Sequence, residues 1–305
     1  MQNKSMNIIR LLGFLLLLGL SIPSYAFQRV KELSLFGTDA VVTSAILDLS
    51  QSKAYFATAP GRFPFSMEQL AGSVVRVSLI SRKIEAHVTL QPGEVPLSTP
   101  LIDPSHDSLY VGVYGDPNRG FPAQVVQIRL SPFQREKRFT CDSEEFGIGA
   151  AILSQNGNVA YFGTLYGSII ELELPSLSLM GRVGFQREDN AFRTAVLDPK
   201  GEYGYFATAT GSILKINMAT FSPVGSLTVL RGTHGFTASI IDPDGKYAYF
   251  ATNESPARLF QIDLKAFKVL DTYTFDEGSN AIVSGSLGIY ARTRLLITPL
   301  RLKKG

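Results

Sequence analysis

Four carboxylates could bind a divalent cation if the fold brought them together. Glu94, Glu145, Asp189 and Asp276 each lie in a polar stretch between two apolar runs. Carboxylate oxygens are the ligands that Ca²⁺ and Mg²⁺ prefer in proteins. The interpretation that we prefer is simpler, because stretches that connect apolar segments are polar when they are exposed to water. The sequence therefore predicts no cofactor, and these four residues are the ligands only if a divalent metal is bound.

A second group of residues combines aromatic rings with arginine, the composition typical of binding hot spots. These residues lie in two stretches, 59–72 and 114–123, that are longer than the corresponding stretches elsewhere in the chain. Insertions of this kind often carry function, so we expect a binding surface made of Arg62, Phe63, Phe65, Tyr114, Arg119 and Phe121. The alternative is that both stretches fold back and pack their own side chains.

Motifs of enzyme catalysis are missing from the sequence. The three histidines, His87, His106 and His234, fall at different places in the repeat described below and cannot converge on one metal. Ser286 lies in S-G-S-L-G, which lacks the first glycine of a nucleophile elbow. Cys141 is the one cysteine, so it forms no internal disulfide, and its acidic neighbours would raise the pKa of its thiol. We interpret it as a structural residue.

Residues 1–26 have the three parts of a secretory signal peptide. Lys4 and Arg10 form a basic start, residues 11–20 are apolar, and Ser24-Tyr25-Ala26 offers small residues before a cleavage point. Because spanning a bilayer takes about 20 apolar residues, we expect cleavage rather than anchoring. The mature domain, 27–305, is then periplasmic or secreted.

The charge balance argues against nucleic acid as a partner. The 305 residues include 29 basic and 26 acidic side chains, and cleavage would remove two of the basic ones, Lys4 and Arg10. A nearly neutral chain lacks the electrostatic footprint of a nucleic-acid-binding protein.

The elements that must position these residues are repeated β-hairpins. The stretch S-I-I-D-P-D-G-K-Y-A-Y-F-A-T at 239–252 consists of two apolar runs joined by a tight turn. The first residue of this turn is Asp242, and the equivalent residues in the other copies are Asp48, Asp103, Ser154 and Asp198. Along the chain, these five positions are separated by 55, 51, 44 and 44 residues. A unit of 44 residues with four predicted strands has the size of one β-propeller blade.

The repeat predicts an all-β, six-bladed propeller of four-stranded blades, with seven blades as the second alternative. Residues 281–300 supply three strands of a sixth blade, and Phe27–Phe36 resembles an outer strand. The N-terminal strand would then complete the last blade and close the ring, which leaves no exposed sheet edge at the join. One closed ring predicts one domain.

At 197–208 and 241–252 the pattern I/L-D-P-x-G-x-Y-x-Y-F-A-T resembles the repeats of exported propellers of the YVTN and NHL type. The resemblance covers nearly all of the mature chain, although the literal Y-V-T-N string is absent. It implies a propeller and leaves the ligand open.

We therefore expect an exported, non-enzymatic propeller that binds a protein, peptide or glycan through its loop face. That face would carry the connections between blades and those between the second and third strands of a blade. The alternative function is a metal-dependent hydrolase or lyase of the propeller lactonase kind. The sequence leaves the oligomeric state open.

Overall fold

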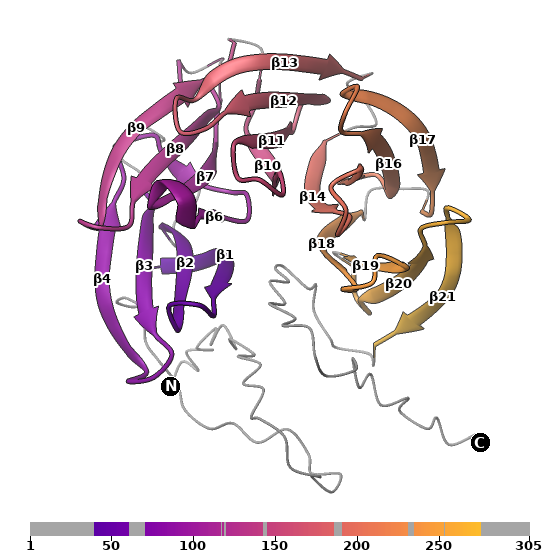
Figure 1. Ribbon diagram of the computed structural model, residues 1–305, viewed down its shortest axis with the longest axis horizontal. Coiled ribbons are helices and arrows are strands. Elements are labelled where there is room, and N and C mark those ends of the chain that lie inside the picture. Colours follow the sequence, from indigo (N-terminus) through magenta and orange to yellow (C-terminus); the bar gives the residue numbers. More distant parts are fainter. Residues whose placement is uncertain are drawn as a thin grey trace, which may run out of the picture.

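The protein is an all-β propeller built from four-stranded antiparallel blades (Figure 1). The computed structural model describes residues 40–60, 71–116, 118, 120–142, 145–185, 191–230, 235–252 and 254–275. In each blade the first strand lies nearest the centre and the fourth forms the periphery (Figure 1). The described residues also contain one short 3-10 helix, Pro104–His106. None of their helices is long and apolar enough to cross a membrane.

The strand bounds follow the predicted repeat closely. Blade one contains β1 (Ala40–Asp48), β2 (Lys53–Pro60), β3 (Ser73–Ser78) and β4 (Lys83–Thr89). Blade two contains β5 (Val95–Pro96), β6 (Leu101–Asp103), β7 (Ser108–Tyr114), β8 (Gln124–Arg129) and β9 (Gln134–Thr140). Blade three contains β10 (Ile148–Leu153), β11 (Val159–Thr164), β12 (Ser168–Glu173) and β13 (Ser178–Gly184). Blade four contains β14 (Phe192–Leu197), β15 (Tyr203–Thr208), β16 (Ser212–Asn217) and β17 (Ser222–Thr228). Blade five contains β18 (Phe236–Ile241), β19 (Tyr247–Thr252), β20 (Arg258–Asp263) and β21 (Lys268–Thr274).

The structure corrects the predicted number of blades. The described residues form five blades, not six or seven. The strands predicted for a sixth blade, at 281–300 and Phe27–Phe36, lie outside the described residues, as does the predicted signal segment, 1–26. The predicted order of strands within each blade is confirmed, apart from the innermost strand of blade two, which is split into β5 and β6.

One side chain caps the first hairpin of every blade. The Oδ1 atom of Asp242 accepts hydrogen bonds from the backbone N–H groups of Lys246 and Tyr247 at 2.7 and 3.0 Å. Side-chain oxygens at the four equivalent positions, Asp48, Asp103, Ser154 and Asp198, accept backbone N–H groups in the same way. The turn role predicted for this position is therefore confirmed in all five blades.

The turn caps fix which side chains enter the seams between blades. A tyrosine lies seven positions after each capping residue, and in four blades it packs against the following blade: Tyr55, Tyr110, Tyr161 and Tyr205. The next residue points to the opposite face and packs against the preceding blade, as Phe162, Phe206 and Phe250 do. Because side chains alternate along a strand, neighbouring residues of the second strand pack in the two different seams on either side of the blade.

Blade five keeps one flank open among the described residues. In blade four, the side chains of Val196, Tyr205 and Ile213 are at most 8% exposed. The equivalent residues in blade five are Ile240, Tyr249 and Leu259. All three of the blade-five side chains are partly exposed. Within the described ranges, each seam from blade one to blade five has an apolar cluster, and no cluster joins blade five to blade one.

Burial of ionisable core groups makes the stability sensitive to alkaline pH. Desolvation raises the pKa of the Tyr110 and Tyr161 phenols and of the Cys141 thiol to about 12. These groups lose their protons near pH 10 (Tyr) and about 8.5 (Cys) in an unfolded chain. Between these pH values and about pH 12, the native protein therefore binds more protons than the unfolded protein. The stabilisation is complete below about pH 8.5 and is lost as the pH rises toward 12.

We predict that the thermal unfolding midpoint, followed by circular dichroism, falls steadily from pH 9 to 12. Tyr110→Phe removes one of these titrating groups and should flatten the fall, because each unit of pKa shift is worth about 1.4 kcal/mol. Tyr273→Phe is the control, because this side chain is 37% exposed. Tyrosines that all ionise near pH 10 while the circular dichroism stays native would contradict the prediction.

Candidate functional site

A recess of about 260 Å³ lies on the loop face at the seam between blades one and two. The connection between these blades contributes Pro92 and Gly93, and the insertion of blade two contributes Gly120, Phe121 and Pro122. The remaining lining residues are Gln124 from β8, and Arg138 and Thr140 from β9. An insertion and an inter-blade connection therefore meet at this recess.

Strand register explains why the polar lining residues share one face. Gln124 is paired with Thr140 across β8 and β9, and Val126 with Arg138. Val126 belongs to the apolar cluster of the seam between blades one and two. Because alternate residues of a strand point to the same face, Gln124, Arg138 and Thr140 also face blade one.

The ring of Phe121 forms an apolar wall of the recess. It lies against Gly93, whose φ is +85°, and an added Cβ atom there would be 2.7 Å from Phe121 Cδ1. Ala59, Val95 and Tyr114 form a small apolar cluster with Phe121. Hydrogen bonds in both directions between the backbones of Asp116 and Phe121 close the insertion on itself.

Glu94 organises the charges beside the recess. Its carboxylate is 2% exposed and accepts two hydrogen bonds from Arg135, Nε at 2.8 Å and Nη2 at 2.5 Å. Arg138 lies farther away, with Nη1 3.5 Å from Glu94 Oε1 and 3.3 Å from Gln91 Oε1. Since Arg135 already neutralises Glu94, the three ionised side chains carry a net charge of +1.

Gln124 presents a hydrogen-bond acceptor that the described residues leave unused. Its side chain is 9% exposed, and its Oε1 atom is buried without a hydrogen-bond donor among them. A buried acceptor without a donor costs about 1–3 kcal/mol. This cost is offset if a ligand supplies an N–H or O–H group.

The six predicted binding residues stay a prediction, and the structure describes two of them. Of the six predicted binding residues, Tyr114 and Phe121 lie at the seam, where both are partly buried rather than free in solvent. Arg62, Phe63, Phe65 and Arg119 lie outside the described residues. Gln124, Arg138 and Thr140 were missed, because only cross-strand register brings them to the recess.

The predicted metal ligands do not meet in the part of the chain that the structure describes. Glu94 is bound by Arg135, and Glu145 Oε1 by Arg182, which also binds Asp142. Asp189 and Asp276 lie outside the described residues. Within the described ranges, no three His, Cys, Asp or Glu side chains are placed to hold one metal ion.

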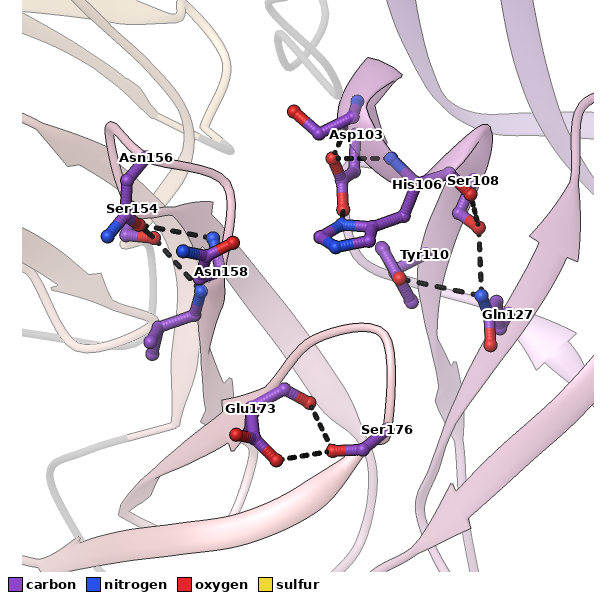
Figure 2. Close-up of polar contacts among 12 residues, drawn as sticks. Asp103, His106, Ser108, Tyr110, Gln127, Ser154, Asn156, Asn158, Glu173 and Ser176 are labelled. Carbon is purple, nitrogen blue, oxygen red and sulfur yellow. Dashed lines mark hydrogen bonds and ion pairs between the residues drawn. The ribbon is translucent and has the colours of Figure 1, made fainter.

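On the opposite face, which carries the first hairpin turns, Asp103 and His106 form a close pair (Figure 2). Asp103 is fully buried, and its Oδ2 atom lies 2.5 Å from His106 Nδ1. This resembles the way a carboxylate orients a catalytic histidine. The hydroxyl of Ser108, however, donates to the backbone carbonyl of His106 at 2.8 Å and accepts from Gln127. The group thus secures the turn between β6 and β7 and activates no hydroxyl.

No protein-family model matches the chain, and a search among curated proteins finds no match. The function must therefore be argued from the chemistry of the site. The resemblance to YVTN and NHL propellers stays a prediction.

We predict that Glu94→Gln lowers the free energy of unfolding by about 3 kcal/mol, because removing one member of a buried ion pair leaves an uncompensated charge. Glu136→Gln is the matched control. Its pair with Arg129 is 30% and 45% exposed, and exposed pairs contribute about 1 kcal/mol or less. Urea denaturation measures both variants, and equal losses of stability would contradict the structural role of Glu94.

Proposed function

We propose that this chain is an exported, non-enzymatic propeller that binds a protein, peptide or glycan, with the recess between blades one and two as its binding site. One observation carries the proposal. Gln124, whose Oε1 atom is buried without a donor among the described residues, lines a recess that also has a cationic side chain and an aromatic wall. Ligand sites typically combine apolar walls with a few polar groups that orient the ligand.

Export to the periplasm or the medium remains part of this proposal and rests on the predicted signal segment, 1–26. The ion pairs support binding over the metal-dependent hydrolase or lyase. Carboxylate oxygens held by arginine, as in Glu94 and Glu145, are poorly placed to accept a cation.

The proposal is tested with arrays of defined peptides and defined glycans probed with the mature chain. We expect a chemically related set of probes to bind the wild type and to lose at least tenfold in affinity with Arg138→Glu. Lys200→Glu makes the same change of charge at an exposed turn on the opposite face and should bind like the wild type. Failure of every probe, or equal binding by both variants, would overturn the proposal.

Ring closure is a separate proposal about the same chain. We infer that residues 27–36 and 281–300 cover the open flank of blade five, as the predicted closing strands would. The support is the apolar character of Ile240, Tyr249 and Leu259, which are partly exposed where the equivalent blade-four side chains are buried. Uncovered apolar surface of this kind is unfavourable in water.

We predict that a cysteine introduced by Leu259→Cys reacts slowly with a maleimide in the native protein, because covered thiols are protected. Leu270→Cys is the control on β21, where the leucine is 49% exposed, and it should react rapidly. The native Cys141 is buried and interferes with neither measurement. Equal rates at both positions would show that the flank is uncovered.

A further inference from the structure

We propose that the recess between blades one and two binds a carboxylated sugar residue, a hexuronate, as a monosaccharide or as one unit of a glycan. This inference rests on the proposed binding function and narrows its ligand class. At the next seam along the ring, between blades two and three, other residues occupy the same positions.

At the seam between blades two and three, the residues at the equivalent positions bind one another. Arg182 in β13 is the register equivalent of Arg138 in β9. Glu145, in the connection between blades two and three, is equivalent to Glu94 in the connection between blades one and two. Arg182 binds Glu145 directly through Nη2, and its Nε donates to Ser168 Oγ at 3.3 Å. The cavity beside this group is only about 10 Å³. An arginine at this position therefore has its own carboxylate and hydroxyl partners.

Two differences open the seam between blades one and two. Arg135 stands where blade three has Leu179, and it takes both oxygens of Glu94. Arg138 is thereby left at 3.5 Å from Glu94 and is 44% exposed. Gln124 stands where blade three has Ser168, and the described contacts of Arg138 use only Nη1. Arg138 lines the recess, and its Nε and Nη2 atoms have no hydrogen-bond partner among the described residues.

The free donors of Arg138 select a carboxylate. A guanidinium binds a carboxylate through two parallel N–H···O hydrogen bonds, and the net charge of +1 beside the recess is balanced by a single negative charge. A phosphate monoester would bring nearly two charges at neutral pH. The second arginine is already committed to Glu94.

Gln124 and Thr140 select a ligand that also carries hydroxyl groups. The buried Gln124 Oε1 atom needs a donor, and a carboxylate has none to offer. A sugar hydroxyl donates to this oxygen and still accepts a hydrogen bond from a neighbour. Thr140, paired with Gln124 across the strands, can supply such a neighbour.

Phe121 and the size of the recess select a single ring. The walls of Pro92, Gly93 and Pro122 are apolar, and Phe121 lies beside them. The face of an aromatic ring carries partial negative charge and attracts the C–H groups on one face of a pyranose. At about 260 Å³, the recess is below the usual range of about 300–1,000 Å³ for drug-sized ligands, which suits one sugar unit.

The test is calorimetric and NMR titration of the mature full-length chain with methyl glucuronide. Methyl glucoside serves as the neutral match, and an acetylated dipeptide acid as the peptide carboxylate. We expect the glucuronide to bind at least tenfold more tightly than either. Arg138→Gln should abolish this preference, Gln124→Leu should weaken the glucuronide at least fivefold, and Lys200→Gln should change nothing.

The outcomes separate this inference from the function on which it rests. Equal binding of glucoside and glucuronide, or no glucuronide binding, overturns the uronate assignment. If the dipeptide acid alone binds and Arg138→Gln removes it, the recess is a peptide-carboxylate site and the proposed binding function survives. If none of the three binds and the arrays also yield nothing that depends on Arg138, both proposals fail.

Discussion

The interaction on which the rest of the structure depends is the cap of the first hairpin in each blade. One side-chain oxygen accepts a backbone N–H group two to five positions ahead and so fixes the turn that joins the first two strands. Because strand side chains alternate, a slip of one residue would exchange the two faces of that strand. The tyrosine seven positions later would then point toward the preceding blade. The cap therefore determines both the fold of one blade and its fit to the next.

Three of the four seams between the described blades contain the same aromatic contact. Tyr55, Tyr161 and Tyr205 each contact an aromatic ring in the turn between the third and fourth strands of the following blade. Glycines bring the first hairpin turns of adjacent blades together on the opposite face. Gly245, with φ at +65°, lies so close to Pro199 that an added Cβ atom would be 2.7 Å from its Cδ. The positive φ of the turn and the close approach of Pro199 therefore both require glycine at position 245, because only glycine satisfies them without strain.

The sequence was informative about the features that repeat and poor on those that do not. Capping residues and strands recur at set intervals, and the insertions lengthen two of those intervals, so their places could be predicted from the sequence. The ion pairs of Glu94 with Arg135 and of Glu145 with Arg182 join residues about 40 positions apart, and no local pattern announces them. The sequence therefore suggested Glu94 and Glu145 as ligands of a possible metal ion, whereas in the structure both of them neutralise arginines. Gln124 and Arg138 escaped notice for the same reason, since their proximity is a property of register and not of spacing.

Departure from the repeat is what distinguishes one seam from the others. Between blades two and three, one arginine satisfies one glutamate and the contact closes. Between blades one and two, Arg135 takes the glutamate, Arg138 lies 3.5 Å from it, and Arg138 and Phe121 of the insertion both line the recess. The seam thus leaves Arg138 with long contacts through Nη1 alone, to Glu94 and Gln91, and leaves the Gln124 Oε1 atom without a donor among the described residues. Because equivalent blades form equivalent seams, the proposed binding site lies at the seam where that equivalence is broken.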